Sequence, residues 1–341
     1  MIPYEIKINR LFYYWLMTSF FLVLIMVIVG GLTRLTDSGL SITQWELFKG
    51  VLPPLSNDQW DSYFSRYKEI PQYKLLNEGM SLKQFKIIFY WEYIHRILGR
   101  LIGLFFLIPL LFFSFKKSLA KKNLSVCYLI SFLIVVQGII GWYMVQSGLV
   151  NNITVSHFRL SLHLSLAFII ISLIFWILLN LKNKTNINFF IHKKEYYISY
   201  LLIFFIFLQI IIGAFVSGLD AGKIYQTWPL MNHSYFPTDV IIYSLKDLFD
   251  FNNHGLVQFY HRNLAYFITI YIIIIGISLF IKKLKYIYKS FLIVIFFLIL
   301  QILLGVITLT SGLHIYLASL HQICSLLLVL SVINLHYNYI K

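Results

Sequence analysis

The chain has 341 residues, of which 59% are hydrophobic and only 12% are charged, and its mean hydropathy is +0.78. Soluble domains carry roughly a quarter charged residues, so soluble enzymes and disordered scaffolds are excluded and a polytopic membrane protein remains. The 28 basic and 13 acidic residues give a net charge of +15, which would suggest a nucleic-acid partner only in a soluble chain.

Eight continuous apolar stretches are long enough to cross a bilayer as helices, which takes about 20 residues each. Because these stretches do not alternate between apolar and polar residues, lipid-facing strands are excluded. The predicted fold class is therefore an all-α polytopic membrane protein. The predicted spans are 11–33, 89–113, 124–146, 158–181, 197–219, 257–281, 288–310 and 314–336.

Basic residues in the short loops predict the orientation of the spans. Lysines gather in the loops after the second, fourth and sixth spans, whereas the loops after the third and seventh spans carry no Lys or Arg. Lys7 and Arg10 precede the first span, and Lys341 ends the chain. Both termini are therefore expected in the cytoplasm, with the long loops after the first and fifth spans outside. The positive charge reports topology, and no nucleic-acid partner is expected.

The two halves of the chain carry the same motifs in the same order, which indicates an internal repeat. Equivalent helices are four spans apart, so the halves have the same orientation. We expect two pseudo-symmetric four-helix bundles, comprising residues 1–190 and 191–341. The matched features are Gly30–Gly39 with Gly213–Gly222, His95-Arg96 with His261-Arg262, Gln137 and Gly141 with Gln301 and Gly305, and His163 with His321.

Four histidines, His95, His163, His261 and His321, each lie about two turns into an even-numbered span. At a rise of about 1.5 Å per residue, all four imidazoles would lie about 10 Å below the outer surface. Two from each half at one depth favour bis-His ligation of haem within a helical bundle. A zinc site is less favoured because no Cys or carboxylate cluster accompanies either pair, and a proton-relay transporter is the other alternative. The remaining six histidines are expected at the surface or the membrane interface.

Arg96 and Arg262 directly follow two of these histidines. Because Arg pairs bidentately with carboxylates, the two arginines are candidates for binding haem propionates. The alternative is that they reach lipid head groups at the interface.

Glu92 breaks the repeat, since the second half has Gln258 at the same offset from its histidine. A carboxylate inside the membrane edge costs roughly a few kcal/mol unless it is paired or protonated. One interpretation is an ion pair with Arg96 four residues on. The other is a carboxylate that stabilises positive charge or manages protons beside one cofactor. The asymmetry predicts chemistry at the N-terminal site and a permanent electron-carrying haem at the C-terminal site.

With these motifs the chain resembles the haem A synthase family over nearly its whole length. The resemblance is carried by Trp91-Glu92-Tyr93-Ile94-His95-Arg96, Phe158-Arg159-Leu160-Ser161-Leu162-His163, Gly213–Gly222, Val257-Gln258-Phe259-Tyr260-His261-Arg262 and Leu320-His321-Gln322. Some bacterial members carry a cysteine pair in an outer loop, which this chain lacks. It therefore looks like the alphaproteobacterial and mitochondrial branch.

The resemblance implies oxidation of the C8 methyl of haem O to a formyl group by successive hydroxylations, which gives haem A for terminal oxidases. It implies that His261 and His321 hold one haem b, that His95 and His163 face the substrate haem O, and that Glu92 is important for turnover. Haem O synthase is an expected transient partner, and self-association is left open.

Two other functions compete with this interpretation. A non-catalytic di-haem b cytochrome that transfers electrons would leave Glu92 unexplained, and a proton-coupled transporter would leave four histidines at one depth unexplained. The roughly ten residues before the first span lack the Arg- and Ser-rich character of an organelle transit peptide. A bacterial inner membrane is therefore the expected location, with the haem sites near its outer face.

Overall fold

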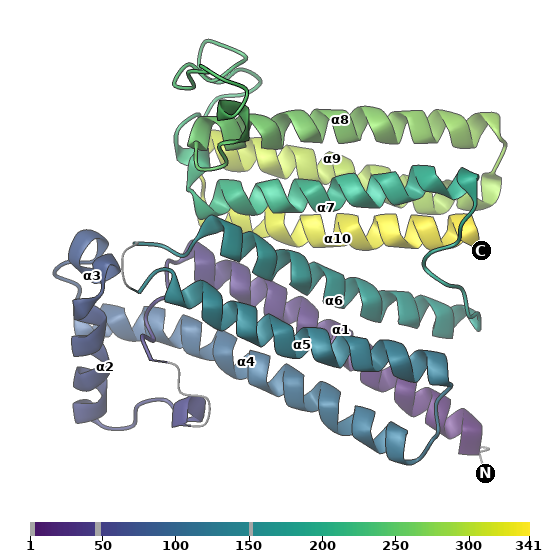
Figure 1. Ribbon diagram of the computed structural model, residues 1–341, viewed down its shortest axis with the longest axis horizontal. Helices are drawn as coiled ribbons and strands as arrows, with labels where there is room; N and C mark the ends of the chain where they lie inside the picture. The colour runs from purple at the N-terminus through teal and green to yellow at the C-terminus, as the bar shows by residue number, and fades with distance from the viewer. Residues whose placement is uncertain (1–3, 45–48, 150–152) are drawn as a thin grey trace. The chain divides into compact units, whose positions relative to one another are not determined.

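The computed structural model describes residues 4–44, 49–149 and 153–341, and in these ranges the chain is helical and forms no β-strand beyond one isolated bridge (Figure 1). Eight of its helices are long and apolar enough to cross a membrane. The prediction of an all-α, eight-span membrane protein is therefore confirmed. These helices are α1 (Tyr4–Leu35), α4 (Leu82–Phe115), α5 (Lys121–Gln146), α6 (His157–Asn183), α7 (Tyr197–Gly218), α8 (His254–Ile281), α9 (Tyr288–Thr310) and α10 (Ile315–Ile340).

The chain divides into two compact units, residues 1–174 and 175–341. The first unit contains α1, α4, α5 and most of α6, together with two short helices in the loop between α1 and α4, α2 (Asn57–Glu69) and α3 (Pro71–Leu76). This loop and the loop between α7 and α8 are called the outer loops, after the side of the membrane predicted for them. The second unit contains the end of α6, α7 to α10 and short 3-10 turns at Lys194–Tyr196, Ala221–Lys223, Asp247–Phe249 and Lys285–Ile287. A further 3-10 turn, Lys49–Val51, belongs to the first unit.

Helix α4 begins seven residues before the apolar stretch from which its span was predicted. Its N-terminus is capped by Ser81, whose side chain accepts from the Gln84 amide in a capping box. The added turns pack against α2, which lies across this end of α4 (Figure 1). His95 therefore lies thirteen residues after Leu82, whereas the other three candidate histidines lie six or seven residues after the first residue of their helices. The depth of the four rings in the membrane stays a prediction.

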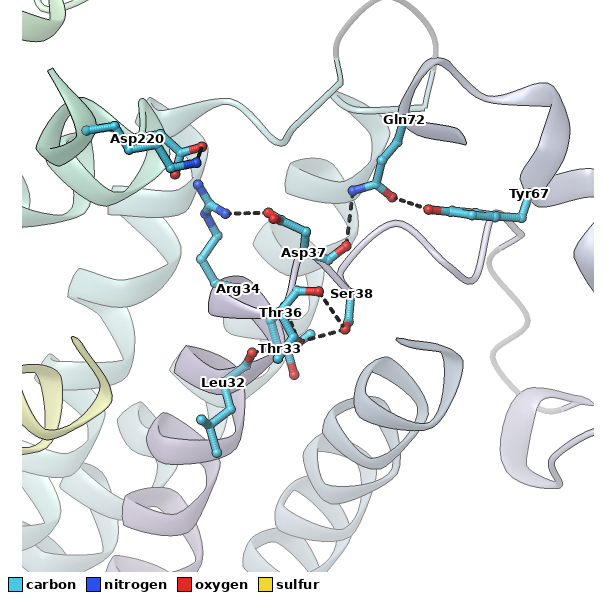
Figure 2. A network of polar contacts seen from close by, with 10 residues as sticks. Leu32, Thr33, Arg34, Thr36, Asp37, Ser38, Tyr67, Gln72 and Asp220 are labelled. Carbon is cyan, nitrogen blue, oxygen red and sulfur yellow. Dashed lines mark hydrogen bonds and ion pairs between the residues drawn. The ribbon is translucent and has the colours of Figure 1, made fainter. Parts of the chain in front are cut away.

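A polar network joins the end of α1 to α2 and α3 (Figure 2). Asp37 has a left-handed backbone, with φ of 49°, and its carboxylate accepts from Arg34 at 2.8 Å. The Asp37 carbonyl accepts from Gln72 at 3.0 Å, and Gln72 accepts from the Tyr67 hydroxyl at 2.9 Å. Burial raises the pKa of Tyr67 to about 12, so this hydroxyl stays a donor at neutral pH. The network fixes the direction in which the outer loop leaves the membrane helix.

The second unit repeats this helix end. Asp220 ends α7 with the same left-handed backbone, with φ of 52°, and is paired with Lys223 at 3.0 Å. Since Asp37 and Asp220 lie at the same distance from Gly30 and Gly213, the repeat seen in the sequence extends to the local backbone.

His336, which was expected in a loop or near an end, is buried instead, whereas His157, which was expected at the outer interface, is the first residue of α6. His336 is 0% exposed and His157 is 8% exposed. The two ring nitrogens of His336 lie 2.8 Å from the Ser199 hydroxyl and 3.2 Å from the Phe189 carbonyl. The expectation failed for His336 because α10 continues to Ile340 and this end of it is covered by aromatic residues.

Candidate functional site

Each of the four candidate histidines packs against a glycine of the preceding membrane helix. A Cβ atom added to any of these glycines would lie 2.9 to 3.0 Å from Cε1 of the facing imidazole, which is closer than side chains normally approach. Glycine is therefore required at all four positions unless the ring moves. The pairs are Gly30 with His95, Gly141 with His163, Gly213 with His261, and Gly305 with His321.

In the first unit, the His95 and His163 rings face each other. Their centroids are 6.5 Å apart, and the ring planes make an angle of 39°. If metal–imidazole bonds are about 2 Å long, two rings on opposite sides of one metal ion have centres roughly 6 Å apart. The Nδ1 atoms of both rings are buried without a hydrogen-bond partner in the described part of the chain. The separation of the two rings therefore fits ligation of one haem iron by both histidines.

In the second unit, His261 and His321 are each accompanied by a glutamine from the facing helix. Gln209 Nε2 lies 3.1 Å from His261 Nδ1 and donates to the His261 carbonyl at 2.9 Å. Gln301 Nε2 lies 3.3 Å from His321 Nε2. Two imidazoles seated against glycines also fit a bis-His haem here, because each glycine makes room for its ring between the helices and imidazole is a haem ligand.

Glu92 is 3% exposed and forms the predicted ion pair with Arg96. Its Oε1 accepts from Arg96 Nη2 at 2.6 Å and from Nε at 3.0 Å, while its Oε2 accepts from the Ser41 hydroxyl at 2.7 Å and the Ile42 amide at 2.8 Å. The carboxylate thus connects α4 to the start of the outer loop. A role in chemistry at His95 stays a prediction.

Both site arginines also bind backbone carbonyls of an outer loop. Arg96 Nη2 donates to the Ile42 carbonyl at 2.9 Å, and Arg262 Nη2 donates to the Tyr225 carbonyl at 3.0 Å. Ile42 and Tyr225 are equivalent, since each lies twelve residues after the aligned glycine. The two arginines therefore hold their loops in the same way, and the binding of haem propionates stays a prediction.

Gln209 is the residue of this site that the sequence patterns did not single out. It stands four residues before Gly213, as Gln137 stands before Gly141 and Gln301 before Gly305. That spacing could have identified it. Comparison of the two halves did not reveal this spacing, because the residue of the first half that aligns with Gln209 is Met26.

The chain is similar to known proteins along nearly its whole length. Residues 13–333 match the family described as "Cytochrome oxidase assembly protein". A haem A synthase from Pelagibacter ubique is 52% identical over 323 residues, which cover 93% of each chain. Haem A synthases from Rickettsia bellii and Rickettsia africae are 42% and 38% identical over 334 and 339 residues, each covering 96% of this chain and 97% of the relative. These relatives belong to the alphaproteobacterial branch that the missing outer-loop cysteines indicated. The chain therefore belongs to the cytochrome oxidase assembly protein family, which includes the haem A synthases.

Proposed function

We propose that this chain oxidises the C8 methyl of haem O to a formyl group and so produces haem A for terminal oxidases. The observation that carries the proposal is 52% identity to a haem A synthase over 93% of the chain. Two successive hydroxylations replace two C–H bonds of one methyl carbon by C–O bonds and give a hydrate, which loses water to leave the formyl group. This is a four-electron oxidation, and an oxidant outside this chain accepts the electrons. Each half also contains a pair of membrane-embedded histidines suited to a porphyrin iron, which the alternative of a proton-coupled transporter does not require.

The two halves have different roles in this proposal. In residues 1–190, His95 and His163 bind the iron of the substrate haem O. In residues 191–341, His261 and His321 hold one haem b. A bound haem b supplies one-electron transfer. The distance of 6.5 Å between the His95 and His163 rings supports ligation in the first half.

The chain's own residues orient the substrate and control its surroundings. The four glycine contacts fix how far each imidazole can move, because the ring lies directly against the facing helix. Arg96 in α4 and Arg262 in α8 donate to carbonyls of the outer loops, and their guanidinium groups would also pair with the propionates of a bound porphyrin. Glu92, one turn from His95, would stabilise positive charge that develops at the methyl carbon.

The protein is placed in a bacterial inner membrane, with both termini in the cytoplasm and the haem sites near the outer face. The lysines between α4 and α5, between α6 and α7, and between α8 and α9 support this orientation. Because haem O is the proposed substrate, transient contact with haem O synthase is part of the proposal.

Expression in a host that makes haem O but no haem A tests the activity. Haem extracted from the membranes and separated by chromatography should contain haem A only when the chain is present. Haem O and haem b without haem A, in membranes that contain the folded protein, would leave the non-catalytic di-haem cytochrome as the better interpretation.

A further inference from the structure

The helices that face the four histidines share a second feature beside the glycine. One turn before each glycine stands a residue whose side chain lies on the same helix face. It is a glutamine in α5, α7 and α9 and a methionine in α1. The residues are Gln137, Gln209, Gln301 and Met26.

The glutamines contact their histidines in three ways. Gln137 Nε2 donates to the His163 carbonyl at 3.0 Å, and Gln301 Nε2 approaches the His321 ring. Gln209 Nε2 contacts both the carbonyl of His261, at 2.9 Å, and its Nδ1, at 3.1 Å, and lies farther from Nε2, at 3.5 Å. In the first unit the equivalent Met26 has no donor to offer, because a thioether is only a weak acceptor.

The contact at Nδ1 matters because the second ring nitrogen controls a histidine ligand. A hydrogen-bond partner there fixes the tautomer and the ring orientation and changes the basicity of the ligating nitrogen. The Gln209 amide is suited to this task, since rotation about its Cγ–Cδ bond presents either a donor or an acceptor. Its Oε1 is buried and has no hydrogen-bond partner among the described residues, so the acceptor is free to be used.

The opposite arrangement is found in the first unit. His95 Nδ1 is buried with no hydrogen-bond partner in the described ranges. The Met26 side chain instead lies along α4, with its Cε 3.4 Å from a Cβ position on Gly99. The His95 ring is therefore held by packing against Gly30 and by its own helix, without a polar side chain at Nδ1.

We propose that Gln209 is a positioning residue for His261 and helps the C-terminal half to retain its haem. The N-terminal half has Met26 at the equivalent position, which lets that half release its haem. This inference rests on the proposed function, in which His261 holds a resident haem b and His95 a substrate that must leave as product. A permanent ligand benefits from a fixed ring, whereas a ligand of a substrate has to release it.

The reciprocal variants Gln209→Met and Met26→Gln test the proposal in the full-length protein in detergent. Haem transfer to excess apomyoglobin gives the rate of loss, and the reduction potential and low-spin spectrum of the bound haem b report on ligation directly. Gln209→Met should lose haem b roughly tenfold to a hundredfold faster, which is the usual size of such effects on metal sites. It should also shift the reduction potential. Met26→Gln should slow the loss of haem O.

Three controls make the result decisive. Gln226→Met makes the same chemical change on an exposed loop of the second unit and should behave as wild type. Rates of haem loss are compared only for monodisperse, folded protein, so that poor folding of a variant is not mistaken for weak haem binding. Gln209→Leu provides a second apolar replacement. Wild-type loss of haem b and an unchanged potential in both Gln209 variants, or unchanged haem O loss in Met26→Gln, would overturn the proposal. His261→Ala tests the proposed function separately, since retention of haem b in that variant would refute the ligand assignment itself.

Discussion

The Glu92 carboxylate accepts four hydrogen bonds, two at each oxygen. Its counterpart in the other half, Gln258, donates to the Tyr225 carbonyl at 2.8 Å. Both side chains therefore tie the beginning of an outer loop to a membrane helix, and a neutral amide is enough for that task beside Arg262. The negative charge next to His95 is the feature that only the N-terminal half possesses.

Glu92→Gln is therefore expected to fold and to keep the C-terminal haem b. Haem A formed per folded molecule should fall about a hundredfold or more, because removing one preorganised charged group from an active site typically has an effect of this size. Chromatography of extracted haem should show haem O or a hydroxylated intermediate in place of haem A.

Ser41→Ala is the matched control for this variant, because it removes one hydrogen bond to Glu92 Oε2 and leaves the charge in place. It should retain most of the activity. Near-normal activity per molecule in Glu92→Gln, or an equal loss in Ser41→Ala, would show that Glu92 acts by anchoring the loop.

At the scale of the helices, the contact between glycine and imidazole is the repeated unit of the site. Gly141 and Gly138 lie on the same helix and differ in what faces them. A Cβ on Gly141 would lie 3.0 Å from His163 Cε1, whereas a Cβ on Gly138 would meet nothing within 4 Å. Replacement of either glycine by Ala should favour the helix by about 0.5–1 kcal/mol. The difference between the two variants therefore isolates the contact with the ring.

Gly141→Ala should weaken haem O binding and haem A formation at least tenfold, whereas Gly138→Ala should match wild type. The readouts are the haem O content of the purified protein and the haem A yield. Equal behaviour of the two variants would mean that the position of the His163 ring does not limit the reaction.

The membrane helices could be predicted from the sequence because each is a long apolar stretch. The ion pair of Glu92 with Arg96 could be predicted because it requires only that the two residues lie four positions apart on one helix. The start of α4 was missed because its first turns are more polar than a membrane span. The capping box from Ser81 to Gln84 marks this start in the sequence, but the contact with α2 cannot be recognised in any local pattern. The same holds for Ser41 and Ile42 at Glu92, which come from about fifty residues away in the chain. His336 was misplaced because its burial depends on aromatic residues from other elements.

At the scale of the whole molecule, the repeat reuses one arrangement twice. Three features recur at equivalent positions of the two halves: the left-handed Asp37 and Asp220, the arginine contacts at Ile42 and Tyr225, and the four glycine–histidine pairs. Two departures from the repeat lie one helical turn from the contact of His95 with Gly30: Glu92 replaces Gln258 before His95, and Met26 replaces Gln209 before Gly30. This is where a substrate site would be expected to differ from a site for a resident cofactor.

The proposed orientation can be checked with single cysteines, since the native Cys127 and Cys324 are both buried. Asn57→Cys, on the outer loop, should react with an impermeant thiol reagent in intact cells stripped of their outer membrane. Lys117→Cys should react only after lysis. The reverse pattern would place the haem sites near the cytoplasmic face.

The division of work between the halves is the central claim, and the haem content of purified variants tests it most directly. His95→Ala and His261→Ala are expressed with a source of haem O, and the haem of each folded protein is extracted and quantified by chromatography. The account predicts that His95→Ala keeps haem b but yields no haem A, whereas His261→Ala loses haem b and still binds haem O. Loss of haem b from His95→Ala with retention in His261→Ala would contradict it.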